Sequence, residues 1–278
     1  MKFVDIKNDI AFRKIFGNEN KKEILISFLN AVLELQKGKL ITKIEIKNPF
    51  QLPEIKGLKS SILDVKVTDE RETSYIVEMQ VEEPDGFDKR VQYYTAKQYS
   101  SQIEIGEDYP KLNQVIFIGI LNFKFFEGID YLTKHLIINQ KNGKQELRDL
   151  EFNFIELPKF EEEKIKIESL IEKWIYFIKK APNLDVIPEN INDEGLKHAY
   201  EDAAEYNWTK EELLAYDYAS MRKADENSKT KRAVEKAIDQ EKIETVKEFY
   251  KNGVSIEIIS ISVKLPIERI KQILEIND

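Results

Sequence analysis

The sequence contains no cysteine, and its 278 residues include only two histidines, His135 and His198. Without cysteine the chain can form neither a disulfide bond nor a thiolate metal site. Two scattered histidines also argue against a histidine-rich zinc site and against an obvious Ser-His-Asp triad.

Long apolar segments are missing as well. No apolar run approaches the roughly 20 residues that a helix needs to cross a bilayer. The first residues, MKFVDIKNDIAF, lack the apolar core of a signal peptide. We therefore expect a cytoplasmic protein that does not interact with membranes. The length allows one large domain or two smaller ones with a substantial core.

The net charge of −8 argues against a protein that binds nucleic acid over its whole surface. The charge is unevenly distributed, however. Residues 1–60 hold 12 basic and 7 acidic residues, whereas residues 61–160 hold 12 and 18, and residues 161–278 hold 19 and 26. The basic first part could contact phosphates, although lysine-rich helix faces are more commonly just solvated.

The most informative stretch runs from Ser61 to Gln80 and reads as two strands joined by a polar turn at 68–73. The strands are expected at 62–67 and 75–80. Because side chains alternate across a strand, Asp64 shares a face with Lys66, and Glu78 shares a face with Gln80. If the strands pair as a hairpin, the two faces can coincide, and the two carboxylates then lie side by side.

Neighbouring carboxylates repel each other, and one would tend to stay protonated. A hard divalent cation removes this conflict, since Mg²⁺ binds one or two carboxylates and keeps water and substrate oxygens in its other positions. Such an ion can activate water and stabilise charge on a phosphate oxygen. The alternative is a half-buried hairpin whose polar residues are merely solvated.

Several motifs follow one another over about residues 1–160, and each is weak when taken alone. In order they are DIAFRKIF at 9–16, LDV at 63–65, IVEMQ at 76–80, RVQYYTAK at 90–97, GEDY at 106–109 and IELPKF at 155–160. Together they resemble the Rpn-like family of recombination-promoting nucleases, also described as putative transposases, in the PD-(D/E)XK nuclease superfamily.

This resemblance implies a restriction-endonuclease-like α/β (α+β) fold, in which a mixed sheet is flanked by helices. It implies that Asp64 and Glu78 hold Mg²⁺, or another hard cation such as Mn²⁺ or Ca²⁺. Because the first helix commonly lends an acid to such a site, Asp9 is a third candidate ligand; it can equally act as a helix cap. The usual Glu-x-Lys element is Glu78-x-Gln80 here, which fits the Rpn-like branch and leaves open what replaces the lysine.

Two roles remain to be assigned in a catalytic site. Gln80 would orient the attacking water or a phosphate oxygen. From strand geometry, Lys66 could supply the charge that the missing lysine normally gives. A helix is expected from Lys89 to about Ile105, and on it Arg90, Tyr94 and Lys97 share one face that could bind the scissile phosphate or its neighbours. Alternatively, Tyr94 is a packed aromatic and Arg90 pairs with an acid.

The rest of the chain predicts further elements and three domains. An apolar strand at 114–121 is expected at the centre of the sheet, and a second strand ends at Pro158. The nuclease-like core is expected at 1–160. A helical extension follows at 161–240, and a small helix-turn-helix-like unit at 241–278 completes an all-helical C-terminal extension.

The C-terminal unit has few basic residues for reading DNA, since Arg269 and Lys271 on its last helix are balanced by Glu268 and Glu275. We therefore favour a protein–protein contact there, such as a homodimer formed through the C-terminal helices.

Two functions are compatible with these observations. The first is a metal-dependent DNA endonuclease linked to recombination, mobile elements or defence. The second is a non-catalytic nuclease-fold protein that binds DNA or a partner. Retention of both carboxylates favours the first.

Overall fold

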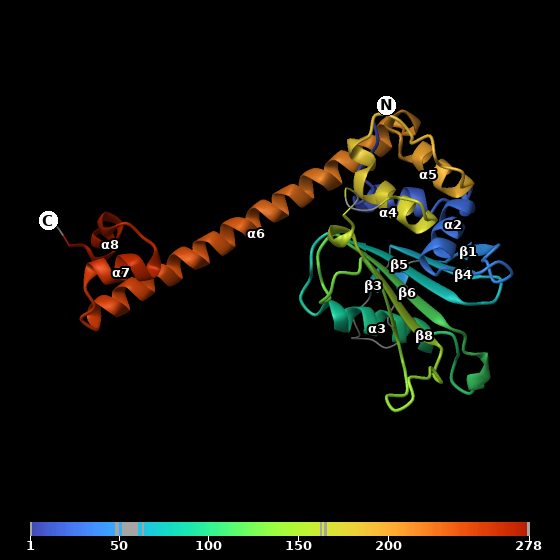
Figure 1. Ribbon diagram of the computed structural model, residues 1–278, viewed down its shortest axis with the longest axis horizontal. Helices are drawn as coiled ribbons and strands as arrows, with labels where there is room; N and C mark the ends of the chain where they lie inside the picture. The colour runs from blue at the N-terminus through green and yellow to red at the C-terminus, as the bar shows by residue number, and fades with distance from the viewer. Residues whose placement is uncertain are drawn as a thin grey trace. The chain divides into compact units, whose positions relative to one another are not determined.

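The computed structural model describes residues 2–47, 50–51, 61–62, 64–161, 163 and 166–276. The chain divides into two compact units, Met1–Asp217 and Tyr218–Asp278. The first unit is built around a mixed sheet with helices on both faces (Figure 1). Leu63 of the motif at 63–65 lies outside the described residues.

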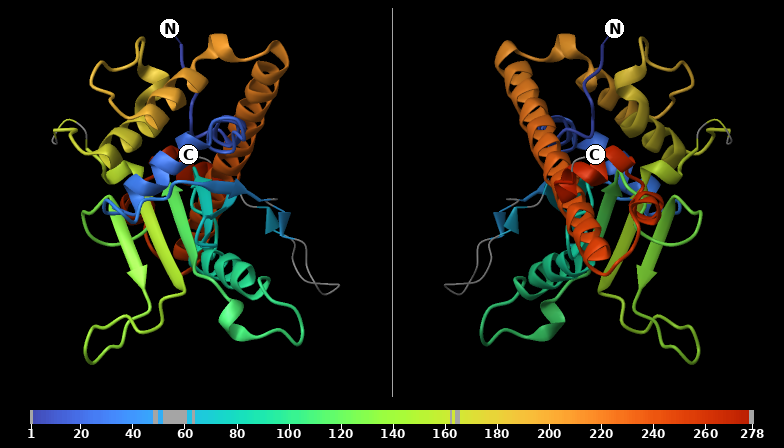
Figure 2. Two further views of the ribbon diagram at one scale, coloured as in Figure 1. Left: turned by 90° about the vertical axis from the view of Figure 1, so that its right-hand side faces the viewer. Right: turned by 90° about the vertical axis from the view of Figure 1, so that its left-hand side faces the viewer.

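Six strands of the described chain form the main sheet in the order β1-β4-β5-β6-β8-β7. The pairs β5–β6 and β6–β8 are parallel, and the other pairs are antiparallel. Figure 2 shows β6, β8 and β7 side by side, with β7 running opposite to the other two. The strands are β1 Ile44–Ile46, β4 Val65–Asp69, β5 Ser74–Gln80, β6 Val115–Leu121, β7 Leu132–Leu136 and β8 Leu150–Glu156, while β2 Phe50–Gln51 pairs with β3 Ser61–Ile62.

Four helices cover one face of the sheet and one helix covers the other (Figure 1). Helices α1 Asp9–Phe16, α2 Lys22–Val32, α4 Leu170–Lys180 and α5 Glu194–Ala203 enclose the larger core, in which Trp174 is completely buried. Helix α3 Phe87–Ser100 packs Phe87 and Val91 against Ile76 and Phe117 on the opposite face. The alternation of side chains along β5 therefore sends Ile76 and Glu78 toward α3.

The sequence predicts most of these elements, and the differences have local causes. Helix α4 begins at Leu170 rather than at 161 because Ser169 and Glu172 form a capping box there. Helix α6 Lys210–Lys251 is continuous and runs across residue 240, where the sequence predicts a domain boundary. Short 3-10 turns lie at Tyr109–Lys111, Leu157–Lys159, Ala181–Asn183 and Glu205–Asn207. The fold class predicted from the sequence is confirmed, including its helical C-terminal part.

The second unit contains the remainder of α6 together with α7 Ile256–Val263 and α8 Ile267–Leu274. These helices enclose a small core formed by Val246, Ile259, Val263 and Ile270. Helices α4 and α5 belong to the first unit in the structure, while the division at residues 160 and 240 stays a prediction about domain boundaries. No helix among the described residues has the length and apolar character needed to cross a membrane.

Candidate active site

The hairpin of β4 and β5 brings Asp64 and Glu78 together. Val65 pairs with Val77, and Lys66 pairs with Ile76. Asp64 lies just before β4, so this antiparallel register places it opposite Glu78. The Oδ2 atom of Asp64 accepts a hydrogen bond from the backbone N–H of Met79 at 2.8 Å, which fixes the carboxylate against the end of β5.

Glu78 is the most deeply buried acid of this site, with only 2 % of its surface exposed. Burial and, to a smaller extent, the neighbouring Asp64 carboxylate raise the pKa of Glu78 to about 8. Arg90, Arg13 and Gln80 act in the opposite direction. Glu78 is thus a strand-borne carboxyl group with a raised proton affinity, held beside a second carboxylate, which is the electrostatic situation that a bound cation relieves.

Two arginines flank the carboxylates. Arg13 of α1 donates from Nη2 to Oδ1 of Asp64 at 3.0 Å. The Nη2 atom of Arg90 lies 3.8 Å from Oε2 of Glu78. The guanidinium of Arg90 also lies over the ring of Phe87, 5.5 Å from its centroid, and over that of Tyr94, at 5.7 Å. Its buried Nε has no hydrogen-bond partner among the described residues.

The other predicted residues are distributed around this centre. Gln80 donates from Nε2 to Oε2 of Glu78 over a long distance of 3.4 Å. Burial raises the pKa of Tyr94, Arg90 lowers it, and Glu78 raises it further, so Tyr94 lies within the electrostatic reach of both groups. Lys97 has its ammonium 5.9 Å from the ring centroid of Tyr93. Arg90 and Tyr94 therefore border the carboxylates, whereas Lys97 lies one to two turns further along α3.

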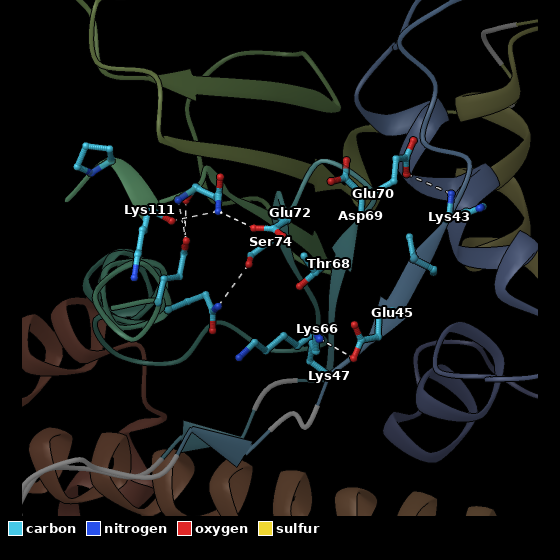
Figure 3. A pocket seen from close by; sticks show the side chains of 15 residues that line it. Lys43, Glu45, Lys47, Lys66, Thr68, Asp69, Glu70, Glu72, Ser74 and Lys111 are labelled. Carbon is cyan, nitrogen blue, oxygen red and sulfur yellow. Dashed lines mark hydrogen bonds and ion pairs between the residues drawn. The ribbon is translucent and has the colours of Figure 1, made fainter. Parts of the chain in front are cut away.

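Lys66 lies on the same face as Ile76, and its side chain extends into a neighbouring cavity (Figure 3). Burial lowers the pKa of Lys66, and the positive charge of Lys47 lowers it further. Neither Asp64 nor Glu78 contributes to that change. Its proposed role as the replacement for a catalytic lysine stays a prediction.

Asp9 occupies the first turn of α1 and is exposed to solvent. The cap of this helix is Asn8, whose Oδ1 accepts from the N–H groups of Ile10 and Ala11. Arg13, one turn later on α1, makes the contact with Asp64. Within the described residues no group of three or more His, Cys, Asp or Glu side chains is arranged to hold a metal ion, so Asp9 stays a predicted third ligand.

Residues 6–233 match the family model described as PD-(D/E)XK nuclease family transposase. The chain belongs to this family. Comparison with curated proteins found no significant match, and comparison with solved structures found none. Family membership confirms the resemblance recognised in the sequence and places the chain in a nuclease and mobile-element context.

PD-(D/E)XK enzymes typically use divalent cations, and the residues present here fit such an ion. Mg²⁺ is commonly held by only one or two carboxylates, with water and substrate oxygens completing its shell. Asp64 and Glu78 supply two carboxylates, and the adjacent amide of Gln80 supplies a neutral oxygen. The contacts of Glu78 with Gln80 and Arg90 both involve Oε2.

Sequence reasoning missed one residue of this site. Arg13 was part of the first family motif but had no assigned role, although it follows Asp9 by four residues and therefore lies on the same helix face. That spacing was the available signal. What the sequence could not reveal is that α1 directs this face toward the hairpin, about 50 residues further along the chain.

Proposed function

We propose that the protein is a metal-dependent endonuclease that hydrolyses phosphodiester bonds in DNA. The observation that carries this proposal is the pairing of Asp64 with the buried Glu78 at the end of the β4–β5 hairpin. Burying two carboxylates side by side is costly without a cation.

In this reaction Asp64 and Glu78 would hold Mg²⁺ or Mn²⁺ through their carboxylate oxygens. When bound, such an ion activates water and neutralises charge on the phosphate. Gln80 would orient the attacking water or a phosphate oxygen through its side-chain amide. Arg13 currently pairs with Oδ1 of Asp64, so it would shift toward the incoming phosphate when that oxygen is needed as a ligand. Asp9 would assist Asp64 and Glu78 as a third ligand of the ion.

Arg90 would take part of the role that lysine has in Glu-x-Lys sites. Its guanidinium is fixed by Phe87 and Tyr94, and its Nε lacks a partner among the described groups. A planar guanidinium can donate two parallel hydrogen bonds to a phosphate. Together with Tyr94 and Lys97, Arg90 would bind the scissile phosphate and its neighbours along α3.

One specific observation favours the second candidate function, a nuclease-fold protein that binds DNA or a partner without cutting. Both oxygens of Asp64 already accept hydrogen bonds, one from Arg13 and one from Met79. With Gln80 in the place of lysine, this arrangement is compatible with a site whose charges are balanced without a metal. The two functions therefore differ in whether metal binding displaces Arg13.

We further propose that the protein acts as a homodimer, because a single site cuts one strand at a time. The second unit exposes apolar side chains on its helices, including Ile258 and Ile261 on α7. Apolar side chains on adjacent helical positions commonly mark a helix–helix contact.

The test is a supercoiled-plasmid nicking assay with Mg²⁺ or Mn²⁺ on wild type, Asp64→Asn, Glu78→Gln and the control Glu127→Gln. Glu127 is exposed and remote in sequence from the hairpin. We expect wild type and the control to nick DNA, both site variants to lose at least 100-fold in rate, and a chelator to stop the reaction.

Two results would oppose this proposal in different ways. Nicking that survives in both Asp64→Asn and Glu78→Gln would show that another site or a contaminant is responsible. Absence of nicking by the wild type in every metal, with DNA still retained in a gel shift, would favour the non-catalytic alternative.

A further inference from the structure

A cavity of about 1120 Å³ lies on the α3 face of the sheet and is lined in part by β4 and by β5, the strand that carries Glu78. Lys66 and Thr68 of β4, Ser74 of β5 and Gln98 of α3 contribute to its lining (Figure 3). Lys66 follows Asp64 by two residues, and Ser74 precedes Glu78 by four. At about 3.3 Å per residue, Lys66 lies roughly 7 Å along the strand from Asp64, and Ser74 lies roughly 13 Å along β5 from Glu78.

The acids around this cavity are already engaged. Glu45 pairs with Lys47, and Glu70 accepts hydrogen bonds from the backbone N–H groups of Thr42 and Lys43. Glu72 accepts from the side chain of Asn113 at 3.3 Å. The carboxylate of Asp69 binds Arg71 and the hydroxyl of Tyr75. These acids are therefore not positioned to neutralise a further cation within the cavity.

The cation that these acids leave without a partner is the ammonium group of Lys66. Its side chain is half-buried, and its ammonium has no hydrogen bond or ion pair with any residue in the described ranges. A partly desolvated ammonium normally has a carboxylate nearby, because burying a charge without a partner is costly. The side chain instead extends into open space (Figure 3), where an anionic ligand could reach it.

Gln98 provides a second, independent sign of a ligand. Only 6 % of this residue is exposed. Its Nε2 makes a long 3.4 Å hydrogen bond to the hydroxyl of Ser74, and its buried Oε1 has no partner among the described residues. The two ends of an amide can exchange places by a flip of the side chain. In either orientation one end of this buried amide remains without a hydrogen-bond partner among the described residues.

We propose that this cavity binds the backbone of the DNA strand next to the scissile phosphate, with Lys66 pairing with a flanking phosphate and Gln98 contacting the same nucleotide. The inference rests on the proposed nuclease function. Each strand of a duplex places a phosphate every 3.4 Å along the helix axis. A strand that follows β4 and β5 therefore places phosphates roughly two to four nucleotides from the cleaved one over the cavity. In this assignment Lys66 is a substrate-binding residue.

The test measures DNA binding by fluorescence anisotropy in EDTA, so that binding is separated from cleavage, across 50–200 mM salt. It compares wild type, Lys66→Gln and Lys37→Gln. Lys37 is an exposed lysine that does not line the cavity, so its substitution makes the same charge change elsewhere. One lost phosphate contact reduces the slope of log K against log salt by about 0.9 for a duplex.

For Lys66→Gln we expect binding about 15-fold weaker at 50 mM salt and about 4-fold weaker at 200 mM, which follows from that slope. Single-turnover cleavage at saturating DNA should be unchanged in the control Lys37→Gln. Gln98→Leu should weaken binding at least 2-fold without lowering the melting temperature, because the substitution also removes an unsatisfied buried group.

An unchanged salt slope in Lys66→Gln would overturn the inference, and so would an equal change in Lys37→Gln. A slower single-turnover rate with unchanged affinity would instead make Lys66 a catalytic residue. A deoxynucleoside monophosphate that binds the cavity as tightly as DNA does would show that the ligand is a free nucleotide rather than a DNA strand. Failure of the nuclease proposal is a different outcome from these, because in that case the wild type does not nick DNA in any metal.

Discussion

Substitution of Glu78 by glutamine should stabilise the metal-free protein while destroying its metal site. Glu78 is almost fully buried beside Asp64, and its pKa in the folded state is about 8 instead of the usual 4.5. Between these two pH values the unfolded chain releases this proton while the folded protein retains it. Folding therefore becomes less favourable as the pH rises through this window. Glutamine has a similar shape and no proton to lose.

The size of the effect follows from the difference in pKa. At about 1.36 kcal/mol for each pH unit, the gap between 4.5 and about 8 corresponds to roughly 5 kcal/mol. The full penalty is present above about pH 8 and is absent below about pH 4.5. Glu78→Gln should therefore gain up to roughly 5 kcal/mol relative to wild type between pH 4.5 and pH 8.5.

The assay is urea denaturation of both proteins at several pH values, with EDTA and again with Mg²⁺. At pH 8 Mg²⁺ should stabilise the wild type, because the ion replaces the proton of Glu78 and favours the folded state. It should leave Glu78→Gln unchanged. For the same reason, nicking at limiting Mg²⁺ should increase with pH up to about 8.

The exposed Glu127→Gln serves as the control and should follow the wild type at every pH. Parallel stability curves for wild type and Glu78→Gln between pH 4.5 and pH 8.5 would refute the reasoning, because they would mean that Glu78 is not held in an environment that disfavours its charge. Stabilisation of Glu78→Gln by Mg²⁺ equal to that of the wild type would place the metal elsewhere.

Three further substitutions test the scaffold by thermal or urea denaturation. Gly195→Ala should cost about 3 kcal/mol, since its new Cβ would lie 2.4 Å from the backbone oxygen of Glu23 and α5 would have to move away from α2; a melting temperature equal to wild type would contradict this close packing. Asp69→Ala should cost about 1–3 kcal/mol because it leaves the buried hydroxyl of Tyr75 without its acceptor, while the exposed guanidinium of Arg71 is solvated; a loss below 1 kcal/mol would show that water replaces the carboxylate. Ser169→Ala should cost about 1 kcal/mol by removing one half of the capping box of α4. Ser169→Thr should retain most of the stability that the cap provides.

The sequence predicted the central part of the fold because the relevant signals are local. Alternation of side chains identified the two strands of the hairpin, and the unbroken apolar run at 115–121 identified the central strand β6, which is buried on both faces. Strand β7 was not predicted. It lies at the edge of the sheet, and its side chains are only half-buried or exposed, so its pattern does not stand out from that of a loop.

The length of α6 also could not be read from the sequence. Its residues from 223 to 240 are almost entirely charged or polar and are nearly all exposed. Such a segment has no apolar stripe whose end would mark the end of a helix. The domain boundary predicted at residue 240 therefore falls within a helix that continues to Lys251.

The sequence by itself determined which carboxylates face the same side of the sheet, since the two-residue period of a strand and a short turn are sufficient to place Asp64 and Glu78 opposite each other. Only the tertiary structure decided what surrounds them. Arg13 reaches Asp64 because α1 packs beside the hairpin, Arg90 approaches Glu78 because α3 crosses the opposite face, and Lys66 opens into a separate cavity. These contacts join residues far apart along the chain, and their partners are set by how helices pack on a sheet, which no local pattern specifies.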